Sequence, residues 1–214
     1  MSDLGISRLH FPVTTLGPGQ RIGIWVQGCS IRCPGCVSAD TWAKAREPMA
    51  LTSVIEVLAS WLREADGITI SGGEPLEQSA ALMQLLTRIR PALDGDVLVY
   101  SGQPLQQALD DPLIKSGLVD AIIPEPYRQN LPQTRALRGS DNQPLVPLTD
   151  LGHQRYREVQ GAPAEPALDL MVDEVSGQVW LAGIPTPGSL ERLAAIIEAK
   201  GGCLTTSADK RRRD

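Results

Sequence analysis

The sequence has few aromatic residues and no long apolar run, and both absences exclude classes of function. Phe, Trp and Tyr make up only 4% of the 214 residues, which disfavours binding of single-stranded nucleic acid by stacking bases on rows of rings. The net charge of -5 disfavours binding to a phosphate backbone. We expect the basic run Lys210-Arg211-Arg212-Arg213 to be a solvated tail. No apolar stretch approaches the ~20 residues that a membrane-spanning helix needs.

Cysteine is also scarce, with four residues in the chain. The first ten residues lack the apolar segment of a secretory signal, so we expect a cytoplasmic protein. Thiols stay reduced in that compartment, and clustered cysteines there indicate metal or redox chemistry rather than disulfides. The length is sufficient for one domain with a core of its own.

Strand and helix patterns alternate over the first 124 residues. Strands are predicted at residues 21–27, 68–71, 96–100 and 119–124, and helices at residues 49–65, 78–89 and 104–116, with Pro112 placed to break the last helix. This α/β pattern is typical of a parallel sheet covered by helices. Ligands of such folds bind at the carboxyl ends of the strands. The sequence places a cysteine-rich loop, a Gly-Gly-Glu-Pro turn and Ser101-Gly102 at three of these ends.

The last third of the chain has a different pattern. Strands at residues 168–172 and 178–182 predict a hairpin, and a helix is expected from the N-cap Ser189 to Lys200. Residues 161–166 resemble a linker. We therefore predict a core domain of residues 1–160 and an extension of residues 161–214 packed on that core. The basic end of the extension, residues 209–214, is expected to be disordered.

Cys29, Cys33 and Cys36 have the spacing C-x3-C-x2-C, which allows three thiolates to converge on one centre. Sulfur ligands favour zinc or an iron–sulfur cluster. A structural zinc takes four ligands, so His10 or Cys203 would have to complete such a site. A cluster held by three cysteines instead leaves one iron open for chemistry. The spacing alone leaves both interpretations open, and Cys203 is otherwise expected to be a small buried hydrophobe.

A second motif, Ser71-Gly72-Gly73-Glu74-Pro75, lies between a predicted strand and a predicted helix. Two glycines allow a ligand to approach the backbone closely. The N-terminus of the following helix offers N–H donors to an anion, and the Glu74 carboxylate can accept from an ammonium group. By itself this motif is most often an ordinary strand-to-helix turn, and it gains weight only beside the cysteine loop.

Together these motifs resemble the radical S-adenosylmethionine (radical SAM) superfamily. Within it, they are most similar to the activating proteins of anaerobic ribonucleoside-triphosphate reductases and their single-cluster relatives. The similarity covers roughly residues 8–150, in the family's order. Its segments are Gly17-Pro18-Gly19, Val26-Gln27-Gly28-Cys29, Cys33-Pro34-Gly35-Cys36, Thr41-Trp42, Ser71-Gly72-Gly73-Glu74-Pro75-Leu76, Tyr100-Ser101-Gly102 and Arg138-Gly139-Ser140-Asp141-Asn142-Gln143.

This resemblance implies two cofactors and a fold. A [4Fe-4S] cluster would be bound by Cys29, Cys33 and Cys36, and S-adenosylmethionine would chelate the open iron through its amino and carboxylate groups. The implied fold is an incomplete TIM-like βα barrel, open on one side so that a large substrate can enter.

The resemblance also implies the contacts of S-adenosylmethionine. The backbone at Gly35, Cys36 and Val37 would lie near the adenine. The turn at Gly72 and Gly73, with Glu74, would hold the methionine ammonium, and Ser101 would contact a carboxylate or ribose.

The implied activity is reductive cleavage of S-adenosylmethionine to a 5'-deoxyadenosyl radical, which would abstract a hydrogen atom from a glycine of a partner protein. That partner would be a glycyl radical enzyme such as anaerobic ribonucleotide reductase, and the electron would come from an external donor such as flavodoxin or ferredoxin. No Ser-His-Asp or paired-carboxylate arrangement is evident, so we predict no catalytic side chain and assign the chemistry to the cofactor.

The chain departs from the family pattern in two places. Residues 124–127 read Pro-Glu-Pro-Tyr where the family usually carries an Asp-Gly-aromatic turn, and the residues after 151 exceed the shortest activating proteins. A second hypothesis is therefore a radical SAM enzyme that modifies a peptide or a small molecule. A third hypothesis is a non-catalytic zinc-binding module.

Several other residues are expected to have ordinary structural roles. We expect Trp25 and Trp42 to pack, Arg138 to be solvated, and His153 to lie on the surface. Asn142 and Gln143 are expected to satisfy loop backbone.

Overall fold

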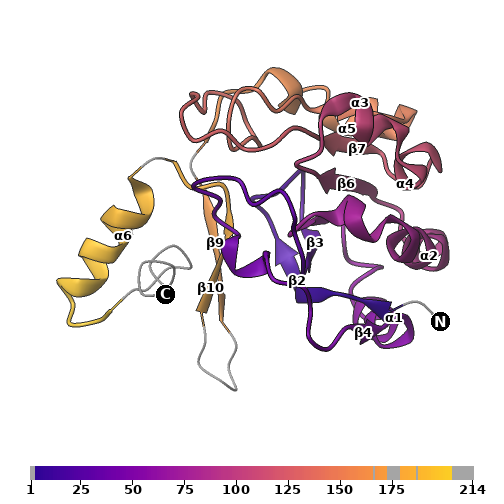
Figure 1. The fold of residues 1–214 in the computed structure, drawn as a ribbon, viewed down its shortest axis with the longest axis horizontal. Helices are drawn as coiled ribbons and strands as arrows, with labels where there is room; N and C mark the ends of the chain where they lie inside the picture. The colour runs from indigo at the N-terminus through magenta and orange to yellow at the C-terminus, as the bar shows by residue number, and fades with distance from the viewer. Residues whose placement is uncertain (1–2, 166, 173–178, 187, 204–214) are drawn as a thin grey trace.

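The computed structural model describes residues 3–165, 167–172, 179–186 and 188–203 (Figure 1). Its centre is a sheet of six strands in the order β2-β3-β5-β6-β7-β8. The inner strands β3, β5, β6 and β7 are parallel, and the edge strands β2 and β8 are antiparallel to their neighbours. The bounds are β2 (Ile6–Val13), β3 (Arg21–Val26), β5 (Gly67–Gly72), β6 (Asp96–Tyr100), β7 (Ala121–Ile123) and β8 (Val146–Pro147). The predicted α/β class with a mainly parallel sheet is confirmed.

The helices follow the predicted order with shorter bounds. They are α1 (Leu51–Ala59), α2 (Ser79–Ile89), α3 (Leu105–Asp110), α4 (Pro112–Lys115), α5 (Asp150–Tyr156) and α6 (Ser189–Glu198), with short turns η1 (Ala39–Thr41), η2 (Pro75–Gln78), η3 (Arg90–Ala92) and η4 (Val159–Gly161). The break at Pro112 is confirmed, since the Asp111 side chain accepts from the Leu113 N–H at 2.8 Å and caps α4. None of the described helices combines the length and the apolar character needed to cross a bilayer.

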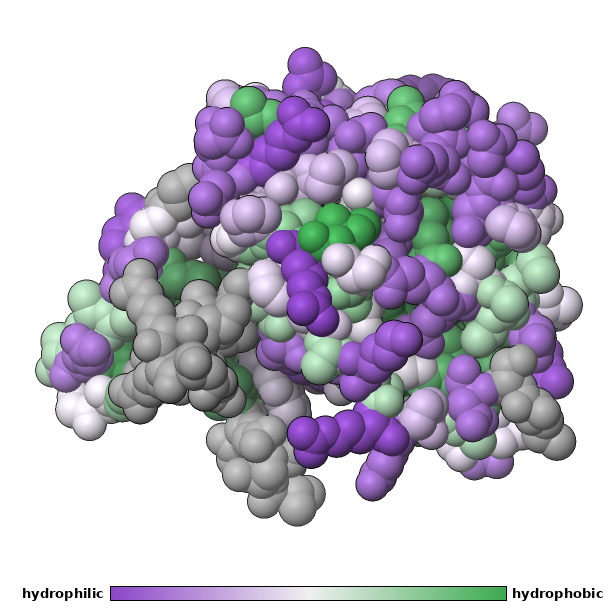
Figure 2. Space-filling model, in the orientation of Figure 1, coloured by the Kyte–Doolittle hydropathy of each residue, from purple (hydrophilic) through white to green (hydrophobic). Residues whose placement is uncertain are grey.

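The main core lies between one face of the sheet and helices α1, α2 and α4, which Figure 1 shows together on one side. Its fully buried side chains alternate along the strands and recur at helical spacing on α1 and α2: Ile22, Ile24, Ile68, Ile70, Val54, Leu58, Leu82, Leu85 and Leu86. Burying each such side chain stabilises the fold by about 1.5–3 kcal/mol. On the face drawn in Figure 2, hydrophilic residues gather at the upper right, over α3 and α4.

The opposite face of the sheet holds a buried ionic network at the amino ends of the strands. Arg21 and Asp96 are fully buried and paired, with Arg21 Nη2 at 2.8 Å from Asp96 Oδ2. Tyr156 donates to Asp96 at 2.5 Å, and Arg21 Nε donates to Thr69 Oγ1 at 2.7 Å. Burial alone would raise the pKa of Asp96, but hydrogen bonds and charge from Arg21, with bonds from Tyr156 and Arg155, outweigh it and lower the pKa.

The predicted hairpin is confirmed as β9 (Leu168–Val172) paired with β10 (Val179–Gly183), while the turn between them lies outside the described residues. The expectation for the helix cap was wrong. Gly188 occupies the N-cap of α6 in a left-handed conformation (φ 77°), and Ser189 is the first helical residue, whose hydroxyl donates to the Thr186 carbonyl at 2.7 Å. Residues 209–214, expected to be disordered, lie outside the described residues.

The sequence patterns missed the strands at the two edges of the central sheet and helix α5. Strand β2 contains Pro12, which weakens a strand prediction and is tolerated here because β2 is an edge strand. The two-residue strands β1 (Asp3–Leu4) and β4 (Met49–Ala50), as well as β8, are too short to leave a pattern. The segment expected to be a linker is paired with a core loop, since the Ala164 N–H donates to the Thr134 carbonyl at 2.9 Å.

Candidate functional site

A cavity of about 250 Å³ opens at the carboxyl ends of β3, β5 and β6. Parallel strands bring their carboxyl ends to one edge of the sheet, so the three loops predicted to carry the site meet there. Every residue predicted for the site lines this cavity: Cys29, Cys33, Gly35, Cys36, Val37, Gly72, Gly73, Glu74 and Ser101. The structure thus brings all of these residues together, and their individual roles remain predictions.

The glycine turn after β5 touches the cysteine loop backbone to backbone. The Glu74 N–H donates to the Gly28 carbonyl at 2.8 Å, and the Gly73 N–H donates to the Val26 carbonyl at 2.8 Å. A Cβ atom on Gly73 would lie 2.1 Å from the Gly28 carbonyl oxygen. Only glycine therefore permits this approach, which holds the cysteine loop against the turn.

Glu74 is buried, with an exposed fraction of 1%, and joins the ends of β5 and β6. Ser101 Oγ donates to Glu74 Oε1 at 2.8 Å, and the Gly102 N–H donates to Oε2 at 2.7 Å. The Leu76 N–H also donates to Oε1, at 3.0 Å. Burial raises the pKa of Glu74, although these three hydrogen bonds oppose the rise. A carboxylate has about four acceptor sites, so one remains for a ligand after these three bonds.

The three cysteines are not joined by disulfides, and their thiols lie close enough to influence one another. Burial raises the pKa of Cys33 and Cys36, and charge on neighbouring thiolates raises it further. Hydrogen bonds from the Tyr127 backbone to Cys33, and from the Ser38 backbone and the Trp42 side chain to Cys36, act in the opposite direction. A bound cation would favour the thiolates.

The donor set fits a cluster better than a single zinc ion. Within the described residues, no three His, Cys, Asp or Glu side chains gather closely enough to hold one metal ion. The three thiols nevertheless face one cavity, as a polynuclear cluster requires. The two candidates for a fourth zinc ligand lie elsewhere, since His10 lines a different pocket, against Trp180, and Cys203 is exposed. The expectation that Cys203 is buried was wrong.

Sequence reasoning missed residues that enter the cavity from outside the three loops. Arg8, on β2, lines it and forms an ion pair with Asp40 beyond the cysteine loop. The Arg8 guanidinium also lies 6.0 Å from the centre of the Trp180 ring in β10. Residues 181–185 form a further part of the wall. No local pattern signals these residues, because β2 and β10 reach the site only through tertiary packing.

Trp25 on β3 and Trp42, which directly follows η1, also line the cavity. The packing role predicted for Trp25 is confirmed, since it is buried against Val13 and Leu16. Trp42 does more than pack, because the interaction of its side chain with Cys36 acts to lower the pKa of that thiol. Its place in the Thr41-Trp42 motif was the available signal.

The turn at residues 124–127, which departs from the family pattern, also borders the cavity. Glu125 has a positive φ of 82°, and its carboxylate accepts from the Leu105 N–H at 2.8 Å. Gln143 donates to the Glu125 carbonyl at 3.0 Å, and Asn142 donates to the Pro126 carbonyl at 2.9 Å, which confirms the backbone roles of both amides.

Arg138 and His153 are both expected to be exposed to solvent, but the structure buries Arg138. Arg138 is 4% exposed and donates to the Gln160 carbonyl at 3.1 Å, so the expectation that it is solvated was wrong. His153 is exposed on α5, as expected.

A mainly parallel α/β sheet whose strand ends carry three convergent thiols beside a glycine-built turn defines an iron–sulfur domain of the radical SAM type. Residues 15–146 match the 4Fe-4S single cluster domain family, and the chain belongs to that family.

Three relatives illustrate the similarity. The anaerobic ribonucleoside-triphosphate reductase-activating protein of Enterobacteria phage T4 is 31% identical over 139 residues, covering 63% of this chain and 88% of the relative. The protein of the same name from Escherichia coli (strain K12) is 29% identical over 143 residues, covering 63% and 93%. The pyruvate formate-lyase-activating enzyme of Streptococcus mutans is 27% identical over 193 residues, covering 85% and 65%.

These findings identify the chain as a radical SAM enzyme of the activase type, with a [4Fe-4S] cluster and S-adenosylmethionine as its cofactors.

Proposed function

We propose that this enzyme generates a radical on a glycine of a partner protein, a glycyl radical enzyme such as anaerobic ribonucleotide reductase. The observation that carries the proposal is the convergence of the three thiols, the Gly72-Gly73-Glu74 turn and Ser101 on one cavity. The names of the relatives, which are activating proteins of such enzymes, support the choice of target.

When bound, the two cofactors supply the chemistry: one electron from an external donor such as flavodoxin or ferredoxin cleaves the C5'–sulfur bond of S-adenosylmethionine, giving methionine and a 5'-deoxyadenosyl radical that takes the glycine hydrogen. The residues of the protein bind the two cofactors and orient them. Cys29, Cys33 and Cys36 hold the cluster. The Trp42 indole and the Tyr127 backbone stabilise the thiolate sulfurs through the hydrogen bonds described above.

The glycine turn and its neighbours hold S-adenosylmethionine in this proposal. Glu74 accepts from the methionine ammonium with its remaining acceptor site, beside the open backbone at Gly72 and Gly73. Ser101 contacts a carboxylate or ribose oxygen. The backbone of Gly35, Cys36 and Val37 lies against the adenine.

The proposal also includes the fold and organisation implied by the resemblance. Four parallel strands with helices on one face and the cavity at their carboxyl ends support an incomplete TIM-like barrel. Core residues 1–160 would perform the chemistry, with residues 161–214 as an extension, in a cytoplasmic protein whose thiols stay reduced.

The test is anaerobic reconstitution with iron and sulfide, followed by addition of dithionite and S-adenosylmethionine. We expect about four irons and four sulfides per chain and formation of 5'-deoxyadenosine. Cys33→Ser should lose both, and Cys203→Ser should keep both because Cys203 is exposed and lies away from the cavity. One zinc per chain, or an intact cluster that yields no 5'-deoxyadenosine, would reject the proposal.

A second candidate is modification of a peptide or small molecule, favoured by the Pro-Glu-Pro-Tyr turn at the cavity. Electron paramagnetic resonance separates the two, because a glycine-centred radical on the partner protein excludes this alternative.

A further inference from the structure

The β9–β10 hairpin presents two faces of different character. Its register sets Leu170 opposite Leu181 and Val172 opposite Val179. Directly opposed residues of an antiparallel pair lie on the same face, so these four apolar side chains form one surface, here termed the outer hairpin face.

The inner face fixes the hairpin to the sheet. Met171 and Ala182 are 2% exposed and pack in one cluster with Val13, Leu16 and Trp25. The Asp169 carboxylate adds a polar anchor to the segment after β2, accepting from the Thr14 N–H at 2.6 Å and from the Thr15 N–H at 3.1 Å. The hairpin is therefore a fixed wall.

The apolar side chains of the outer hairpin face are unusually exposed to solvent. Leu170, Val172 and Val179 have exposed fractions of 65%, 51% and 53%. Single exposed apolar residues are common, but a contiguous group on one small sheet is typical of an interaction site. Figure 1 shows this hairpin between the body of the protein and α6.

This face is continuous with the cofactor cavity. Leu181 belongs to the outer hairpin face and also lines the cavity, and residues 182–185 extend the same wall. Strands β9 and β10 each pair only with the other within the described part of the chain. Their free edges offer backbone groups that can recognise an extended segment. The hairpin also lies beyond residues 15–146, which the cluster-binding family matches.

We infer that the outer hairpin face is the docking surface for the protein substrate and receives an extended apolar segment whose following residues enter the cavity. The inference rests on the proposed function and specifies how that function selects its target. A chain that must deliver one glycine to an interior radical needs support outside the cavity, and an apolar strip beside the entrance supplies it.

The test uses the reconstituted full chain and, as probe, the anaerobic ribonucleoside-triphosphate reductase of the same organism. Two readouts are taken: 5'-deoxyadenosine formed without the reductase, and the glycyl radical formed as its concentration varies. In the double variant Leu170→Lys/Val179→Lys, we expect the half-maximal reductase concentration to rise more than about tenfold, because two apolar contacts are lost. Formation of 5'-deoxyadenosine without the reductase should stay within about twofold, since neither residue lines the cavity.

A second double variant, Leu170→Thr/Val179→Thr, removes apolar surface but keeps strand propensity, and it should show the same effect with an intact fold. Val57→Lys on α1 and Ile196→Lys on α6 alter other exposed apolar residues and should change nothing. Hairpin variants that activate the reductase like wild type overturn the docking inference alone. Loss of a wild-type dimer in those variants, with unchanged activation, would assign the face to self-association and also overturn it. A wild-type chain that forms no 5'-deoxyadenosine overturns the proposed function itself.

Discussion

Ser101 Oγ lies 2.8 Å from Glu74 Oε1 and donates to it across the carboxyl ends of β6 and β5. These residues are separated by 27 positions in the chain, and each follows a different strand. The bond orients the buried Glu74 carboxylate on the cavity wall. The position of the loop after β6 therefore affects how the turn after β5 can bind a ligand.

Glu74→Gln should weaken binding of S-adenosylmethionine by roughly tenfold to a hundredfold, because a hydrogen bond to a charged group contributes about 1.5–3 kcal/mol. Ser101→Ala should have a smaller effect of about threefold to tenfold, since it removes only the orienting bond. Equilibrium dialysis against the cluster-loaded protein measures both. Glu64→Gln, at an exposed position, is the control; equal affinities for all three variants would contradict the prediction.

Gly73→Ala should destabilise the protein by about 1–3 kcal/mol, because the added methyl would collide with the Gly28 carbonyl oxygen. Urea unfolding of the cofactor-free chain measures the change. The matched control is Gly161→Ala, where the added Cβ would meet no atom within 4 Å. Similar unfolding midpoints for the two variants would show that the stability of the protein does not depend on this close approach of the turn to the cysteine loop.

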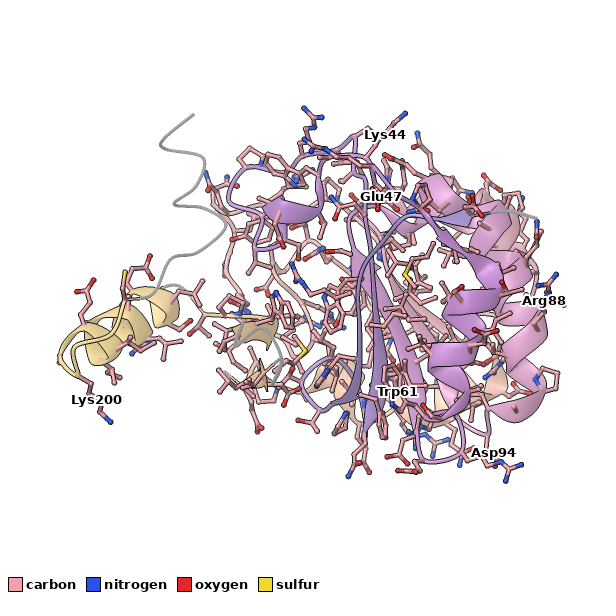
Figure 3. All side chains as sticks on the ribbon, turned by 90° about the horizontal axis from the view of Figure 1, so that it is seen from below. Lys44, Glu47, Trp61, Arg88, Asp94 and Lys200 are labelled. Carbon is pink, nitrogen blue, oxygen red and sulfur yellow. The ribbon has the colours of Figure 1, made fainter. Side chains whose placement is uncertain are left out.

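Trp42→Phe should lower the reduction potential of the cluster. Hydrogen bonds to ligand sulfurs help to set that potential, and loss of one bond of about 1 kcal/mol corresponds to a shift on the order of 40 mV for one electron. A potentiometric titration followed by electron paramagnetic resonance measures it. Trp61→Phe is the control, since Figure 3 shows Trp61 at the opposite end of the molecule from Lys44, which follows the cysteine loop. An unchanged potential in Trp42→Phe would refute the role of the indole N–H.

Asp96→Asn should destabilise the protein by about 3–5 kcal/mol at neutral pH, because it leaves the Arg21 charge buried without its partner. The folded-state pKa of Asp96 lies below its ordinary value of 3.8. The pair's contribution is therefore complete above that ordinary value and is lost as the pH falls through the lower folded-state pKa. Denaturant titrations at several pH values should show the gap between wild type and variant closing in acid.

Asp110→Asn serves as the control for that series, since Asp110 forms an exposed pair with Lys115. Its stability should follow the wild-type curve at every pH. A gap between wild type and Asp96→Asn that stays constant down to strongly acidic pH would contradict the sign of the pKa shift.

The sequence alone determined those parts of the site that depend on neighbours along the chain. The spacing of Cys29, Cys33 and Cys36 permits convergence whatever surrounds the loop. The alternation of strands and helices places the loop, the glycine turn and Ser101 at one edge of a parallel sheet. These features are local or follow from the regular geometry of parallel strands, and they led to the correct cofactors and family.

Only the tertiary structure decided which distant residues complete the cavity. Arg8 and residues 181–185 reach it because β2 lies at the sheet edge and the hairpin packs against β2 and β3. Arg138 is buried, Cys203 is exposed, and Arg21 is paired with Asp96, although nothing near these residues in the sequence distinguishes them. The physical reason is that burial and pairing are set by contacts between segments far apart in the chain, whereas sequence patterns report only the periodicity within one segment.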